Sequence, residues 1–458
     1  MRALIRLAVH LGADIGRVTA LLLCLLLTGF SSLSWAQVAG EVKFLRGVGF
    51  AETPGQLPRA LGRGQTLNEG DRLTTADGSM AIIALKDGTS MTLRPNTEMI
   101  VQKYQFNNVA SEDSMVMQLL RGGFRAVTGL IAKGSANAAK IQTATATIGI
   151  RGTDFDARLC DQDCKAESSR VQEKPVPNAV MASAKLVLAQ GEIHAVDAAS
   201  GRRRLVEGAS VYVGDRVETG PDAKAVLAFR DESRLTLGGN TRFRVENFVF
   251  DDKNPADGRF FVSLLTGTMR ALTGLVAKAG NRNVRFSTAT ATIGIRGTGL
   301  DMDCADSDSC SFFTWLGGIE VTPEGQTAFQ TLQAGQGLFV SRTEIRPLFA
   351  PTLDNLPRPD AVPVNMEQLF SGGQGVTADE PGLFVFVRDG HVEVMSATET
   401  LHLGRGETGF AGSDGRTGRP AFTPLFIQFD RVPLPNSSNP AVIGLITQLS
   451  QRPGNLCR

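Results

Sequence analysis

One stretch of eleven residues occurs twice in this chain, letter for letter. Its sequence is TATATIGIRGT, and it occupies residues 143–153 and again residues 288–298. The two copies lie about 145 residues apart, which is too long for one rung of a solenoid and right for a whole domain. An identity of this length does not arise by chance. We therefore predict that the chain contains a duplicated domain.

The repeated stretch has the pattern of a strand that ends in a tight turn. Residues 143–148 alternate threonine with alanine or isoleucine, which is the period of a β-strand with β-branched residues on one face. Gly149 and Gly152 then flank Ile150 and Arg151, and glycine is favoured where the backbone needs a positive φ or a close approach. We expect a bulge or sharp turn here that fixes the direction of the arginine. The second copy repeats the arrangement with Gly294, Arg296 and Gly297.

The segments that precede the two copies also correspond. Gly70-Asp71-Arg72-Leu73 matches Gly214-Asp215-Arg216-Val217, and a hairpin turn is expected at Asp87-Gly88 and at Asp231-Glu232. A smaller pattern, Gly-x-Val followed by a leucine and a glycine-centred turn, recurs along the chain and begins at Gly40, Gly191, Gly318 and Gly390. The last two occurrences, at Gly318 and Gly390, are not followed by the remaining motifs of a whole domain. We expect their hairpins to close or extend the sheets.

These patterns predict an all-β protein of two tandem duplicated domains. Each domain is expected to be a β-sandwich or a partly open barrel, with a β-solenoid-like stack as the alternative. The predicted organisation is a signal peptide at 1–36, domain 1 at 37–165, a linker at 166–184, domain 2 at 185–345, a linker at 346–380, C-terminal β-hairpins at 381–430 and a tail at 431–458.

The N-terminus has the features of an export signal. Arginines at positions 2, 6 and 17 precede the apolar run 21–27, and Ser34-Trp35-Ala36 offers the small residues that a signal peptidase accepts. We predict cleavage before Gln37 and a periplasmic protein that does not span the membrane afterwards; an uncleaved anchor helix is the alternative. The net charge of +1 gives no electrostatic argument for binding nucleic acid.

The order of motifs in each half resembles the FecR-type periplasmic domain. The most specific part of the resemblance is A-T-x-G-I-R-G-T, which is found at residues 146–153 and 291–298. The resemblance covers 37–165 and 185–345 and implies an all-β periplasmic module for sensing, binding or assembly. The regulator after which the family is named engages a sigma factor through a cytoplasmic segment ahead of a membrane helix. Only about seventeen residues precede the apolar run here, so that signalling role is not carried over.

An acidic loop with two cysteines follows each repeated stretch. In an exported protein, such pairs at equivalent places predict local disulfides, Cys160 with Cys164 and Cys304 with Cys310, and leave Cys457 as an odd thiol. Metal binding through these thiols is less favoured, because the compartment is oxidising and no histidine lies nearby in the sequence. Calcium binding by the clustered aspartates is left open, although their spacing does not match an EF-hand loop.

No catalytic motif is found in the sequence. The chain lacks G-x-S-x-G, H-E-x-x-H and a phosphate-binding P-loop, and its histidines after residue 36, at positions 194, 391 and 402, fall in or beside predicted strands. We therefore expect no catalytic residues, no cofactor and no metal site. Two functions are compatible with this: a sensory or binding module for an envelope protein or a glycan, and a structural or assembly spacer of the cell envelope. A binding module should expose a concave or apolar patch, whereas a spacer should not.

Arg151 and Arg296, with Gly149, Gly152, Gly294 and Gly297, are the residues that the sequence singles out. We predict that the two arginines turn inward as structural anchors, bonded to strand-end carbonyl groups or to a carboxylate such as Asp71 or Asp215. Direct contact with a ligand is the alternative.

Overall fold

The computed structural model describes residues 37–428, apart from 136–137, 172–173, 179, 352, 354–355, 371–375 and 378–379. The predicted signal peptide, the tail and Cys457 lie outside the described residues. Everything described after Val38 falls into one compact unit. Strands dominate it, as predicted, and two sheets of fifteen strands each contain nearly all of them.

The first sheet begins with eleven consecutive strands. They are β1 (Val38–Arg46), β2 (Gly49–Glu52), β3 (Arg59–Ala60), β4 (Thr66–Asn68), β5 (Arg72–Thr75), β6 (Met80–Leu85), β7 (Ser90–Leu93), β8 (Glu98–Gln105), β9 (Ser114–Val127), β10 (Ala139–Gln142) and β11 (Thr147–Cys160). Four strands from the far end of the chain complete it: β28 (Gly382–Met395), β29 (Thr400–Gly404), β30 (Thr408–Gly412) and β31 (Thr417–Gly418).

Long strands turn this sheet into two facing layers. The first half of β9 pairs with β8 and β10, whereas its second half pairs with β7 and β11. The change of partner follows Gly122, whose φ of +79° and whose contact with the backbone of Asn96 exclude a side chain. Strands β11 and β28 pass between layers in the same way. The core of buried apolar side chains draws on both layers, from Val42 and Ile83 in one to Met99 and Met117 in the other. The result is a sandwich that does not close into a barrel.

The second sheet repeats this topology. Its strands are β13 (Ala184–Gln190), β14 (Ile193–Val196), β15 (Arg202–Arg204), β16 (Ser210–Val211), β17 (Arg216–Thr219), β18 (Lys224–Phe229), β19 (Arg234–Leu237), β20 (Arg242–Val249), β21 (Arg259–Leu272), β22 (Val284–Ser287), β23 (Ala291–Cys304), β24 (Ser309–Pro323), β25 (Gln330–Gln333), β26 (Gln336–Ser341) and β27 (Ile345–Leu348). Gly149 of β11 lies opposite Glu393, and Gly294 of β23 lies opposite Glu320. The two copies of the repeated stretch therefore occupy equivalent strands, as the duplication predicts.

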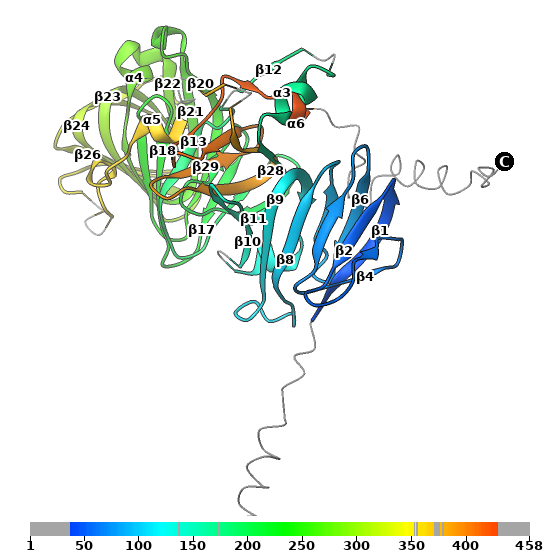
Figure 1. The fold of residues 1–458 in the computed structure, drawn as a ribbon. Coiled ribbons are helices and arrows are strands. Elements are labelled where there is room, and N and C mark those ends of the chain that lie inside the picture. The colour runs from blue at the N-terminus through cyan, green and yellow to red at the C-terminus, as the bar shows by residue number, and fades with distance from the viewer. Residues whose placement is uncertain are drawn as a thin grey trace, which may run out of the picture. The chain divides into compact units, whose positions relative to one another are not determined.

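The two sandwiches differ in where their last strands come from. Strand β23 pairs with β24, which follows it directly in the chain, but β11 pairs with β28, which begins more than two hundred residues later. The C-terminal hairpins therefore extend the first sheet, one of the outcomes that the sequence predicts, and the second sandwich is an insertion within the first. Figure 1 shows this pairing as an orange strand, β28, beside a much earlier one, β11.

Short helices and one further strand pair lie outside the sheets. They are α2 (Leu130–Gly134), α3 (Asp163–Ser168), α4 (Leu275–Ala279), α5 (Met366–Phe370), α6 (Leu425–Gln428), the 3₁₀ turns η1 (Pro255–Asp257), η2 (Asn281–Asn283) and η3 (Pro359–Ala361), and the pair of β12 (Val176–Pro177) with β32 (Phe422–Thr423). No helix among the described residues is long and apolar enough to cross a bilayer.

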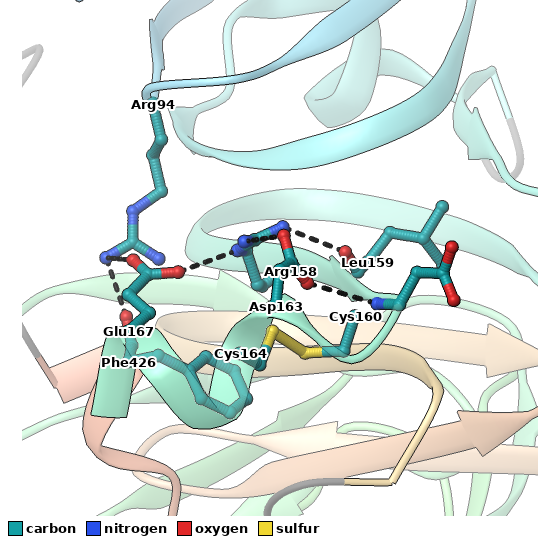
Figure 2. The surroundings of a disulfide bond; sticks show 9 residues. Arg94, Arg158, Leu159, Cys160, Asp163, Cys164, Glu167 and Phe426 are labelled. Atoms are coloured by element: carbon teal, nitrogen blue, oxygen red, sulfur yellow. Dashed lines mark hydrogen bonds and ion pairs between the residues drawn. A yellow bond between two sulfur atoms is a disulfide. The ribbon is translucent and has the colours of Figure 1, made fainter. Parts of the chain in front are cut away.

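Both predicted disulfides are present, Cys160 with Cys164 and Cys304 with Cys310. The first joins the end of β11 to α3 (Figure 2). Beside it, Arg158 donates to Asp163 Oδ2 at 2.6 Å and to Glu167 Oε2 at 3.1 Å, so ion pairs and the covalent link hold the same short helix. These loops are structural elements of the sandwich edge.

Candidate functional site

A buried ion cluster joins the two sandwiches. Lys185 of β13 donates through Nζ to Glu407 Oε2 at 3.1 Å and to the carbonyl oxygen of His402 at 3.0 Å. Arg419 donates to the same two acceptors, at 3.3 and 2.6 Å. The three charged side chains are at most 1% exposed. One carboxylate is thus the shared counter-ion of two cations in a place that water does not reach.

Burial and mutual attraction oppose each other in this cluster. Burial lowers the pKa of Lys185 to about 8, although Glu407 works in the other direction. Burial would raise the pKa of Glu407, but Lys185 and Arg419 outweigh it and hold that pKa below its usual value. The carboxylate is therefore ionised at neutral pH, and Lys185 is close to losing its proton.

Two histidines and a glutamate converge beside this cluster, on β28 and β29. Glu393 and His402 are direct cross-strand partners, and His391 lies two residues before Glu393 on the same face. Nε2 of His391 is 3.4 Å from Nδ1 of His402 and 3.7 Å from Oε1 of Glu393. Burial, followed by the neighbouring His391, lowers the pKa of His402 to about 4, and burial also lowers that of His391. Both rings are consequently neutral at pH 7.

A basic pocket of about 380 Å³ opens next to these residues. The first sandwich contributes Lys133, Arg151 and His391 to its lining, and the second contributes His194 and the three arginines of β15, Arg202–Arg204. Arg203 is held by Asp215 Oδ1 at 3.1 Å. Among the described residues, Lys133, Arg151 and Arg204 make no ion pair with a carboxylate. The pocket therefore presents donors and positive charge that the protein itself does not neutralise.

The structure separates the two arginines that the sequence singles out. Arg151 lines the basic pocket, whereas the side chain of Arg296 is 60% exposed and pairs with Glu320 at 3.0 Å. The inward orientation predicted for Arg296 is wrong. Ile293 and Ile295 point into the core, so strand alternation turns the next side chain outward.

The carboxylates expected to bind these arginines have other partners. Asp71 binds Arg59, and Asp215 binds Arg203, at equivalent places in the two sandwiches. Each aspartate also accepts a backbone N–H group three residues earlier in the chain, at 2.8 and 2.7 Å. The predicted bulge is present in both copies, where Gly152 and Gly297 each have a φ of +57° and the register shifts.

Three aspartates of the two acidic loops are held by separate arginines. Asp154 binds Arg125, Asp163 binds Arg158, and Asp301 binds Arg270. Within the described parts of the chain, the group of three or more metal-ligating side chains that converges is instead His391, Glu393 and His402. The sequence does contain a signal for it: H-V-E on one strand of a hairpin places two ligands on one face, and L-H-L on the return strand supplies the third. Only the hairpin register, which the sequence does not specify, brings the three together.

Comparison with known proteins identifies the repeated unit. A family model described as FecR protein matches residues 71–172 and 215–320. Two crystal structures of a "putative anti-sigma factor" from Parabacteroides distasonis ATCC 8503 are similar to 29% of this chain, with identities of 14% and 13% and a TM-score of 0.24 each. The chain covers 59% of that protein. Comparison with curated protein sequences gave no match.

Proposed function

Because the chain carries two domains of the FecR family, we propose that it is a non-catalytic sensory or binding module of the periplasm, and that its basic pocket binds an acidic segment of another envelope protein. The family supports a regulatory or sensory role, and the two disulfides fit an exported protein.

The basic pocket is the observation that carries this proposal. Guanidinium groups bind carboxylates through two parallel hydrogen bonds, and here Arg151 and Arg204 face a common space from different sandwiches. Strand β15 lies at one end of its sheet, where β14 is the one strand of the described residues that pairs with it. An extended acidic peptide could pair with the free backbone edge of β15 while its carboxylates meet the arginines.

The test is an affinity capture from envelope extracts, followed by mass spectrometry and glycan profiling. The bait is the chain from residue 37, compared with Arg202→Glu/Arg204→Glu and with a control, Arg46→Glu, an exposed arginine that does not line this pocket. We expect the wild type and the control to capture the same envelope protein, and the double variant to lose it. The captured protein should have the same mass after release as before capture, because the module is non-catalytic.

Other outcomes decide between the alternatives. If the wild type retains a glycan and the double variant loses it, the partner is an acidic polysaccharide and not a protein. A bait that retains nothing, or one whose ligand ignores the charge reversal, contradicts the role of the pocket and favours the envelope spacer. A ligand released in altered form would contradict the non-catalytic role.

A further inference from the structure

We propose that His391, Glu393 and His402 bind one divalent transition-metal ion of the zinc type at the seam between the two sandwiches. Two imidazole nitrogens and one carboxylate oxygen form a ligand set that Zn²⁺ uses when a fourth position stays open. The ligand atoms of the three residues all lie within 4.8 Å of one another.

Two of the three separations are close to those of a tetrahedral ion. Zinc bonds nitrogen and oxygen at about 2.0–2.1 Å, so two ligand atoms of a tetrahedral site stand about 3.3–3.4 Å apart. The two histidine nitrogens are 3.4 Å apart. The distance from His391 Nε2 to Glu393 Oε1, 3.7 Å, is a few tenths of an ångström longer. The third pair, His402 and Glu393, lies within 4.8 Å, so the carboxylate has to rotate toward the ion when it binds.

The backbone holds the three ligands on one rigid surface. Glu393 and His402 are paired across the β28–β29 hairpin, and His391 precedes Glu393 by two residues. A strand pair of this kind positions ligands more firmly than a loop does. The ring of His391 is more than nine-tenths buried, and its Nδ1 has no hydrogen-bond partner among the described residues. A buried imidazole without full hydrogen bonding is costly unless another interaction compensates.

The second sandwich forms one wall of the site. Gly208, in the turn between β15 and β16, lies against the ring of His402: a Cβ atom there would stand 2.1 Å from Nδ1 and 2.2 Å from Cγ. Only a glycine leaves room for the ring at this contact. Because one face of the ligand cluster is built by β28 and β29 and the other by this turn, a bound ion would stabilise the docked arrangement of the two sandwiches.

The surrounding charges determine what completes the coordination. Lys185, Arg419 and Arg151 oppose a dication, and Glu407 and Glu393 favour it, so one positive charge is left over nearby. His391 also lines the basic pocket. An anion or hydroxide as the fourth ligand, supplied from that pocket, balances the site better than neutral water does.

The experiment is a titration of untagged, metal-free chain from residue 37 with Zn²⁺ by calorimetry, and with Co²⁺ by visible absorption. We expect one ion per chain, an intense tetrahedral Co²⁺ spectrum and a melting temperature that rises with Zn²⁺. Glu393→Gln should weaken binding at least tenfold, and His402→Gln should abolish the spectrum. The matched control is Glu344→Gln, which changes an exposed glutamate outside this cluster and outside the basic pocket and should bind like the wild type.

Circular dichroism of the metal-free variants shows whether each one is folded. Glu393 is only partly buried, so its replacement tests the ligand role even if a histidine variant fails to fold. No binding by the wild type overturns the proposal. So does loss of binding in Glu344→Gln, or binding that Glu393→Gln leaves unchanged.

Discussion

Replacing Glu407 by glutamine removes the one negative charge that two buried cations share. The side chain keeps its shape, so the change isolates charge from packing. Lys185 and Arg419 are at most 1% exposed and then lose this carboxylate as their shared counter-ion. Breaking a buried ion pair from one side costs about 3–5 kcal/mol. We expect the free energy of unfolding at pH 7 to fall by that amount.

The loss should shrink as the pH rises, because Lys185 can release its proton. The pKa of Lys185 is about 8 in the folded protein, against 10.5 for an ordinary lysine. The unfolded chain therefore binds more protons between these two values, and stability rises with pH there. In the variant, which lacks the carboxylate, the pKa of Lys185 in the folded protein falls below 8. The rise of stability with pH therefore begins at a lower pH than in the wild type. The difference in unfolding free energy between variant and wild type should therefore narrow as the pH rises toward 8.

Urea unfolding measures both effects. Trp315, in β24, is the only tryptophan after residue 36, so its fluorescence follows the second sandwich while circular dichroism follows both. Glu344→Gln, at an exposed ion pair, is the control and should change stability by less than about 0.5 kcal/mol. A loss below about 1 kcal/mol for Glu407→Gln, or a difference that does not depend on pH, would refute the reasoning.

Four further substitutions test other contacts by thermal or urea denaturation. Gly208→Ala, at a φ of +80° and against a buried ring, should cost about 1–3 kcal/mol, and a neutral result would mean that the two sandwiches separate easily. Arg203→Ala should cost about 2–4 kcal/mol because it leaves a buried carboxylate without its cation, while Arg296→Ala should cost less than about 1 kcal/mol; the reverse order would contradict the partners described above. Cys160→Ser removes a five-residue covalent loop and should cost about 2 kcal/mol; an unchanged melting temperature would assign no stabilising role to that disulfide.

Much of the fold is predictable because its signals are local. The repeated stretch predicts the duplication, and the glycines at 152 and 297 predict the bulges. Local cysteine spacing predicts the disulfides for the same reason. The outward direction of Arg296 could also have been derived, since the neighbouring isoleucines already define the buried face. The strand expected from the threonine–alanine alternation is wrong at residues 143–146, which form the turn between β10 and β11, because the hydroxyl of Thr143 accepts from the backbone N–H of Ala146; β11 begins at Thr147.

Long-range pairing is what the sequence does not reveal. The hairpins that begin at Gly318 and Gly390 carry the same motif, and nothing in either says which sheet it joins. The register that pairs Glu393 with His402 depends on a turn of weak sequence preference. The basic pocket and the metal-ligating cluster both depend on which sheet the hairpin joins and on its register. Sequence patterns therefore identify the residues of these sites but do not show that they lie close together.

The insertion of one sandwich within the other imposes an order of assembly. A chain synthesised from its N-terminus delivers β1–β11 first, yet their last partner, β28, arrives only after the whole inserted sandwich. Until then β11 has an open edge that can pair with another chain. If the inserted sandwich folds early, it shortens the connection between β11 and β28 about fourfold and lowers the entropic cost of joining them by about 1 kcal/mol. The inserted second sandwich then serves as a folding template for the first. If the second sandwich fails to fold, both sandwiches remain incomplete.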